Sequence, residues 1–219
     1  VSQIDSFVEI DHPVLELGIP GIGDVERAIG ENCARIIRDG DTLQLGIGAI
    51  PDAVLLFLKD KKDLGIHSEM ISDGVVELME SGVVTNARKT LYQGKTVVSF
   101  LMGSQRLYEF ADDNPAIAMF PVDHVNDPYV IGQNDNLVSI NSCVQVDLMG
   151  QVASESVGLT QISGIGGQLD FVRGARISKG GRSVIAIAST AGSGKISKIV
   201  PFLDAGAAVT TSRTDVDYI

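Results

Sequence analysis

Between Asp24 and about residue 122, segments with the apolar spacing of a helix alternate with short, continuous apolar runs. Such runs are typical of strands buried on both faces of a sheet, whereas spacing of three and four residues indicates amphipathic helices. We expect helices over 24–37, 51–58, 73–81 and 104–110, and strands over 42–45, 64–67, 97–102 and 117–122. Because strand–helix–strand units join parallel strands, this order predicts an α/β fold with an open, mostly parallel sheet flanked by helices.

The pattern changes after residue 122, where helical spacing is absent and strand-like segments follow one another. We expect strands over 137–140, 143–147, 184–188 and 207–211, and only a short helix or turn ending near Gly174. A β-rich segment, arranged as a meander or an insertion, is therefore predicted after residue 122. Residues 1–23 are rich in Pro, Gly and acidic groups, which indicates an extended segment or linker before a domain spanning 24–219.

One carboxylate, Glu69, lies between an apolar run that ends at Ile66 and a helix-start signal at Ser72–Asp73. In open α/β sheets, ligands bind beside the carboxyl ends of strands, and Glu69 occupies such a position. Most charged loop residues are simply solvated, and the local sequence alone favours that interpretation. Evidence from other parts of the chain is needed to distinguish a functional glutamate from a solvated one.

Two glycine-rich turns offer backbone N–H groups to a ligand, namely Gly46-Ile47-Gly48 and Gly164-Ile165-Gly166-Gly167. Without a Cβ, such turns let a substrate approach the backbone closely, and their N–H groups can bind an anion or an oxyanion. The first turn is not a dinucleotide fingerprint, because Pro51 occupies the position of the third glycine. A carboxylate that attacks an acyl group needs such oxyanion donors, so the residues alone indicate acyl chemistry or anion binding at Glu69.

Three other motif resemblances are incomplete. The segment Gly192–Lys195 is similar to a phosphate-binding loop, but Ser189 and Ile196 stand where that motif needs glycine and a hydroxyl residue. We therefore expect a β-turn between two strands. The segment His67–Glu69 has the H-x-E spacing of zinc deaminases but lacks their paired cysteines, so no metal site is expected. Composition leaves a serine-type triad open, although no G-x-S-x-G turn is present.

Charge and cysteine content exclude further classes. The chain has 28 acidic and 17 basic residues, a formal charge of −11, which argues against nucleic-acid binding. No apolar run reaches membrane-spanning length, and we expect no membrane association. Two isolated cysteines, Cys33 and Cys143, exclude a disulfide scaffold and suit the reducing cytoplasm. The chain starts at Val1 and stops at Ile219 directly after an apolar run, so we expect a piece of a longer protein.

Five segments together resemble motifs of the acetyl-CoA hydrolase/transferase family. They are Leu43–Pro51, Gly65–Gly74, Asn141–Val152, Gly164–Phe171 and Thr210–Tyr218. The resemblance extends from about residue 24 to 219 and corresponds to the C-terminal half of such an enzyme, without its N-terminal half and extreme tail. It implies a CoA-transferase-like fold and an enzyme that moves CoA from an acyl-CoA to a free carboxylate.

The resemblance gives Glu69 the central role, because this residue matches the family's catalytic glutamate. Its carboxylate would attack the acyl-CoA thioester, form a mixed anhydride and then carry CoA as a glutamyl thioester. The implied contacts to CoA or the oxyanion are Gly46, Ile47, Gly48, Gly164, Gly166 and Gly167, with Asn126 and His67 beside the substrate. Coenzyme A or acyl-CoA is then a substrate, no cofactor or metal is permanently bound, and a cytoplasmic homo-oligomer active in fermentation is expected.

Several alternatives stay open. An acyl-CoA hydrolase on the same scaffold would let water reach the intermediate, and a non-catalytic acyl-CoA-binding fragment would form no intermediate. His67 is a less favoured candidate for a general base, because a glutamate is ordinarily ionised at neutral pH without help. Basic residues that could face CoA phosphates or simply be solvated are Arg173, Arg176, Lys195 and Lys198. The acyl group is undetermined, with 4-hydroxybutyrate, butyrate, acetate and succinate all open.

Overall fold

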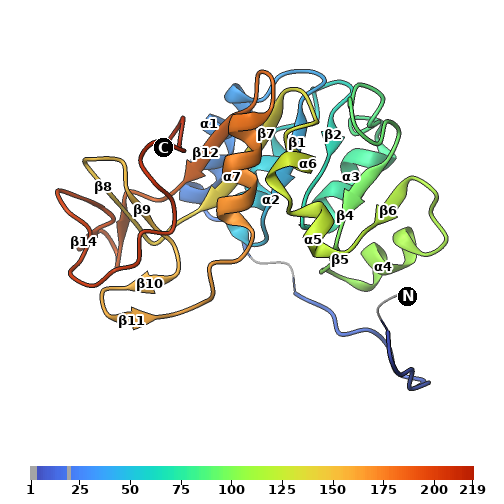
Figure 1. The fold of residues 1–219 in the computed structure, drawn as a ribbon, viewed down its shortest axis with the longest axis horizontal. Helices are drawn as coiled ribbons and strands as arrows, with labels where there is room; N and C mark the ends of the chain where they lie inside the picture. Colours follow the sequence, from blue (N-terminus) through green and yellow to red (C-terminus); the bar gives the residue numbers. More distant parts are fainter. Residues whose placement is uncertain (1–3, 19–20) are drawn as a thin grey trace.

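The computed structural model describes residues 4–18 and 21–219, and its centre is a parallel β-sheet (Figure 1). Four strands follow one another across this sheet in the order β12 (Arg182–Ala186), β7 (Leu137–Ser142), β1 (Thr42–Leu45) and β2 (Gly65–Ile66). All neighbouring pairs are parallel, and Leu43 pairs with Val138 on one side and with Ile66 on the other. The predicted fold class, an open parallel sheet flanked by helices, is therefore confirmed.

Short parallel pairs continue the sheet beyond β2. They are β4 (Thr96–Val98) with β6 (Ile117–Met119), and β3 (Met70–Ile71) with β5 (Phe100–Leu101). A parallel bridge between His67 and Val97 joins this part to the end of β2. The strand predicted over 64–67 is confirmed by β2 and its flanking bridges at Leu64 and His67, whereas the strand predicted over 97–102 is interrupted at Ser99. Glu69 lies opposite this interruption, in the gap between β2 and β3.

Helices cover both faces of the sheet. They are α1 (Asp24–Ile36), α2 (Ala49–Leu56), α3 (Asp73–Glu80), α4 (Gln105–Ala111), α5 (Val122–Val125), α6 (Pro128–Ile131) and α7 (Gln168–Ile177). Val138 and Ile140 of β7 pack into the core cluster that includes residues of α1, α2 and α3, whereas Leu137 packs with Phe171 of α7. Because side chains alternate across a strand, these contacts place α7 on the opposite face, as Figure 1 shows.

The helix starts differ slightly from the prediction. Helix α2 begins at Ala49 with Gly48 as its N-cap, so Pro51 is the third helical residue instead of the first. Proline is tolerated anywhere in this first turn, because the N–H groups there lack an intrahelical acceptor. Ser72 and Ser104 are N-caps of α3 and α4 as expected, but their hydroxyls bind Asp52 and Asp73 instead of their own helices.

The region after residue 122 is only partly β-rich. A hairpin of β8 (Gln145–Asp147) and β9 (Val152–Ala153) is extended by β15 (Ile199–Val200), and β8 confirms the strand predicted over 143–147. Two further small hairpins are β10 (Ser156–Val157) with β11 (Thr160–Gln161), and β13 (Thr190–Ala191) with β14 (Ile196–Ser197). The turn 192–195 joins β13 to β14, as predicted.

Three expectations for this region are wrong. Strands β7 and β12 belong to the central parallel sheet, because α7 forms a complete crossover helix between them. Helices α5 and α6 occupy 122–131, where no helical spacing is visible, because each has only four residues. The expected strand over 207–211 is not formed, and Thr211 alone makes a bridge, to Val152.

Residues 4–18 are extended and exposed, as predicted for the N-terminal segment, and run toward the start of α4. The backbone N–H of Leu17 donates to the carbonyl of Gly103 at 2.9 Å, and the Tyr108 hydroxyl donates to the carbonyl of Leu15 at 3.0 Å. Residues 1–3, 19 and 20 lie outside the described residues. Among the helices of residues 4–18 and 21–219, none combines the length and hydropathy required to cross a membrane.

Candidate active site

Glu69 is held by its backbone in the gap between β2 and β3. Its carbonyl oxygen accepts hydrogen bonds from the N–H groups of Ser99 at 2.8 Å and Phe100 at 3.2 Å. Two donors on one acceptor break the regular ladder here, which explains why both strands are interrupted at the same level. The prediction of a strand-to-helix loop at Glu69 is corrected in this respect, because β3 intervenes before α3. The partly buried side chain of Glu69 is therefore presented by a fixed backbone.

Ser68 connects this gap to the first glycine turn. Its buried hydroxyl donates to the carbonyl of Leu45 at 3.0 Å, and the N–H of Leu45 lies 3.3 Å from the same hydroxyl oxygen. Leu45 is the last residue of β1, and Gly46 follows directly. The backbone of the first glycine turn thus starts beside the residue that precedes Glu69.

The second glycine turn meets the Glu69 side chain itself. Gly167 lies so close that a Cβ at this position would overlap Oε2 of Glu69 and lie 2.6 Å from Nδ2 of Asn126. A side chain at position 167 is therefore incompatible with this arrangement. Three residues that the sequence analysis singled out, Glu69, Asn126 and Gly167, come together in one place although 98 positions separate the first from the last.

Gly167 is also the N-cap of α7, so the positive end of this helix lies at the Glu69 carboxylate. No side chain caps α7, and the first backbone N–H groups of a helix have no intrahelical acceptor. These groups can donate to an anion or a developing oxyanion. The amide of Asn126 adds a second donor, and its buried Oδ1 has no hydrogen-bond partner among the described residues.

Asp170 is a member of this site that the sequence analysis did not single out. It lies in the first turn of α7, and burial raises its pKa, helped by the negative charges of Glu69 and Asp127 and opposed by Arg173. A like charge beside Glu69 raises the free energy of the carboxylate pair and is relieved when one of them is neutralised. Its only sequence signal was its position three residues after Gly167, where the helix brings it back to the same face.

His67 lies behind the site. Its ring is fully buried, with Nε2 2.9 Å from the carbonyl oxygen of Val125 and Nδ1 3.3 Å from Nδ2 of Asn134. Burial lowers its pKa from 6.5 to about 4, with smaller contributions that partly cancel. The ring therefore has no exposed surface to offer a substrate.

The first glycine turn borders a separate cavity of about 300 Å³. Ile47 and Gly48 line it together with apolar residues of α2 and α3, whereas Glu69 does not. Gly48 has φ +111°, a backbone conformation that requires glycine, and no atom would meet a Cβ there within 4 Å. Acidic side chains at the cavity, Asp52 and Asp73 among them, make it unfavourable for phosphate groups.

The second turn is open on its outer side. A Cβ at Gly164 or Gly166 would meet nothing within 4 Å, and Gly166 has φ +59°. The space beside both glycines is thus free for a ligand, whereas the space beside Gly167 is filled by the side chains of Glu69 and Asn126.

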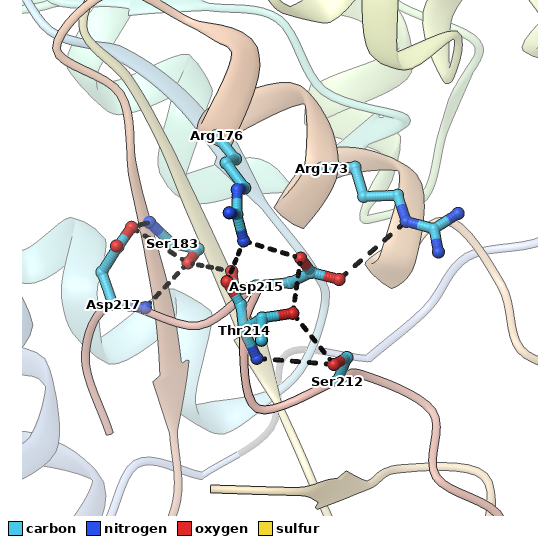
Figure 2. A network of polar contacts seen from close by, with 7 residues as sticks. All are labelled: Arg173, Arg176, Ser183, Ser212, Thr214, Asp215 and Asp217. Carbon is cyan, nitrogen blue, oxygen red and sulfur yellow. Dashed lines mark hydrogen bonds and ion pairs between the residues drawn. The ribbon is translucent and has the colours of Figure 1, made fainter.

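The basic residues considered for CoA phosphates are not arranged as one cluster. Arg173 and Arg176 both reach Asp215, at 4.0 and 3.1 Å, in a polar network that ties the C-terminal segment to α7 (Figure 2). Lys195 is exposed in the β13–β14 turn, and Lys198 is partly buried next to it. Within residues 4–18 and 21–219, no three His, Cys, Asp or Glu side chains are grouped so that they could hold a metal ion.

The chain is similar to several CoA-transferases. Residues 103–219 match the family model described as the acetyl-CoA hydrolase/transferase C-terminal domain. All 219 residues align at 68% identity with 51% of the 4-hydroxybutyrate coenzyme A transferase of Clostridium kluyveri. They align at 55% identity with 50% of a succinyl-CoA:cyclohexane-1-carboxylate CoA transferase of Geobacter metallireducens. The chain thus spans about half the length of these curated relatives.

A solved structure has the same fold. The crystal structure of 4-hydroxybutyrate CoA-transferase from Porphyromonas gingivalis superimposes with a TM-score of 0.82 at 50% identity, over 94% of this chain and 49% of that protein.

Proposed function

Because the chain belongs to the acetyl-CoA hydrolase/transferase family, we propose that it is the part of a CoA-transferase that carries the nucleophile, Glu69. The observation that carries this proposal is the position of the Glu69 carboxylate, against Gly167 at the N-terminus of α7 and near the amide of Asn126. A nucleophilic carboxylate and oxyanion donors in one place are what acyl transfer requires. The proposed reaction moves CoA from an acyl-CoA to a free carboxylate of the 4-hydroxybutyrate or acetate type.

The reaction begins when a carboxylate oxygen of Glu69 attacks the thioester carbonyl of the acyl-CoA. The C–S bond breaks, CoA leaves as a thiolate, and a mixed anhydride joins the acyl group to Glu69. The thiolate then attacks the glutamyl carbonyl, which releases the acyl group as a carboxylate and leaves CoA on Glu69 as a thioester. An incoming carboxylate reverses these steps and leaves as the new acyl-CoA, so Glu69 is regenerated and the thioester energy is retained.

Each tetrahedral step places negative charge on a former carbonyl oxygen. The free N–H groups at the start of α7 and the Asn126 amide are proposed to stabilise that charge, and the helix dipole adds to them. Asp170 contributes in the opposite sense, because Glu69 and Asp170 repel each other as carboxylates and this repulsion ends once Glu69 is acylated. Such a contribution raises the free energy of the starting carboxylate more than that of the intermediate.

CoA itself is proposed to follow the open side of the second glycine turn, at Gly164 and Gly166, with Gly46, Ile47 and Gly48 as the further contact. Gly167 serves a different purpose, since its missing side chain makes room for Glu69 and Asn126. We place the protein in the cytoplasm as a homo-oligomer, in keeping with its reduced, buried cysteines and its exposed apolar side chains.

Trapping of the intermediate tests the proposal. The complete polypeptide that carries this sequence is incubated with acetyl-CoA and treated with borohydride, which reduces a glutamyl thioester to an alcohol, and the peptides are mapped by mass. We expect reduction at Glu69, none in Glu69→Gln, and unchanged labelling in the control Glu31→Gln, an exposed glutamate paired with Arg35. Absence of reduction at Glu69 in the active wild-type protein would contradict the covalent route.

The hydrolase alternative is separated in the same experiment. Without an acceptor, a transferase releases one acid per active site and then stops, because the glutamyl-CoA thioester waits for a carboxylate. A hydrolase continues to release free CoA in proportion to time. Steady CoA release in the absence of acetate would favour the hydrolase, and the non-catalytic alternative predicts binding of acyl-CoA with neither outcome.

A further inference from the structure

His67 joins the elements on which the candidate site is built, although its ring does not reach the site surface. It lies two positions before Glu69, and its Nε2 contacts the carbonyl of Val125, the residue directly before Asn126. Its ring also packs edge-on against Phe171 of α7, with 6.3 Å between ring centroids. The gap that presents Glu69, the end of α5 that presents Asn126, and α7 therefore meet at one imidazole.

We propose that His67 is a positioning residue that sets the Asn126 amide relative to the Glu69 carboxylate through its hydrogen bond to Val125. The inference rests on the proposed function, because it assigns His67 a task in the acylation of Glu69. It replaces direct substrate contact or general-base catalysis by His67, for which the fully buried ring offers no surface.

The hydrogen bonds fix the protonation state of the ring. A carbonyl oxygen only accepts, so the contact to Val125 requires a proton on Nε2. The Asn134 amide nitrogen only donates, and it also donates to the carbonyl of Ile131 at 3.4 Å, so Nδ1 of His67 must be the unprotonated acceptor. The ring is thus a neutral Nε2–H tautomer with both nitrogens engaged.

The surroundings keep the ring neutral. The Nδ1 side faces amide N–H groups, the buried ammonium of Lys89 lies near, and His124 is a further neighbour that disfavours positive charge. A neutral ring with a hydrogen bond at each nitrogen has one orientation. Its hydrogen bond to the Val125 carbonyl then holds the end of α5 in a fixed position. Helix α5 has only four residues and little rigidity of its own, so Asn126 depends on such a contact.

Paired substitutions test the positioning role in the complete polypeptide. His67→Phe keeps the aromatic packing on Phe171 but removes the N–H donor, whereas His67→Gln can still donate to Val125. We expect His67→Phe to slow single-turnover acylation of Glu69 by roughly 10- to 100-fold, because small displacements of catalytic groups are costly. The Kd for acetyl-CoA should stay within about twofold, and His67→Gln should recover most of the rate. Wild-type rates in His67→Phe, equal losses in rate and binding, or no recovery in His67→Gln would overturn the proposal.

A double-mutant cycle separates positioning of Asn126 from general loosening of the fold. If His67 acts through Asn126, His67→Phe should slow acylation far less in an Asn126→Ala background than in the wild type. Fully additive effects would contradict the proposed route. His12→Gln, an exposed histidine in the N-terminal segment, is the matched control and should leave acylation unchanged.

A measurement on the unmodified protein stays informative even if the variants fold poorly. The chain has three histidines, so the ring nitrogen resonances can be assigned by NMR. We expect one histidine to keep a protonated Nε2 and an unprotonated Nδ1 from pH 5 to pH 8, as its pKa of about 4 requires. A proton on Nδ1 of His67 would overturn the inference. Failure to trap CoA on Glu69 of the wild type would instead refute the proposed function and leave this tautomer result standing.

Discussion

At the scale of single residues, the main feature of the candidate site is the close contact between its three members. The Glu69 carboxylate, the Asn126 amide and the backbone of Gly167 fill one volume, and a single methyl group at position 167 has no room. Tight packing of this kind holds reacting groups in a narrow range of positions, which is the main way an enzyme lowers the entropy cost of a reaction. Gly167 is therefore a sensitive place to test the geometry.

Gly167→Ala should lower the rate of acyl exchange by about 100-fold, because its Cβ pushes the Glu69 carboxylate away from the start of α7. The measurement is the steady-state transfer of CoA from acetyl-CoA to an added carboxylate, with circular dichroism to confirm the fold. Gly21→Ala is the matched control, since a Cβ there would meet no atom within 4 Å. Equal rates in Gly167→Ala and wild type would mean that the two side chains do not face Gly167 as described.

The sequence predicted the members of this site better than their arrangement. Glu69 and the glycine turns were recognised from motif resemblance, but nothing in the spacing of residues predicts that Gly167 touches Glu69 while Gly48 lines another cavity. Such contacts depend on how α7 crosses the sheet, and helix orientation is decided by packing. The burial of His67 was equally hidden, because a histidine in a polar segment looks exposed.

At the scale of elements, the alternation of strands and helices up to residue 122 was sufficient to predict the parallel sheet. It was not sufficient after that point, because β7 and β12 are short apolar runs like those of hairpins and their crossover helix α7 has Gly174 in its interior, where the sequence predicted its end. The interruption at Ser99 was also invisible, since an apolar run does not reveal where a ladder is broken. Tertiary pairing, and not local preference, decides these points.

Lys89 illustrates how the elements around the interruption are held. Its buried ammonium donates to the carbonyls of Ile66, at the end of β2, and of Lys95, just before β4, both at 2.7 Å. Burial lowers its pKa from 10.5 to about 7, and no carboxylate offsets this among its hydrogen-bond partners. A basic group with a lowered folded-state pKa binds fewer protons folded than unfolded between these two values, so its contribution to stability rises with pH.

The free energy of unfolding of the wild type, minus that of Lys89→Met, should therefore increase from pH 7 to pH 9. The expected slope is up to about 1.4 kcal/mol per pH unit, because one proton is taken up on unfolding across this range. Urea denaturation at several pH values measures it, with the exposed Lys62→Met as a control whose difference from the wild type should be flat. A pH-independent difference for Lys89→Met would show that the lysine titrates at its ordinary value.

At the scale of the whole molecule, the chain exposes several large apolar side chains. Large apolar side chains that are at least 74% exposed are Phe7, Val8, Leu15, Tyr129, Leu148, Leu159 and Phe202. The chain spans about half the length of its curated relatives, and exposed apolar patches are typical of contact surfaces. The formal charge of −11 opposes contact between copies of the chain.

These two properties together predict how the chain behaves by itself. Apolar patches favour self-association and the net negative charge resists it, so association should strengthen when salt screens the charge. Sedimentation velocity of the 219-residue chain at low and high ionic strength measures this directly. Leu159→Ser and Phe202→Ser, each at a strongly exposed apolar side chain, should weaken association. Gln161→Ser, at an exposed polar position two residues from Leu159, should not. A monomer at all concentrations and salt levels would mean that the exposed apolar side chains are too scattered to form a contact surface.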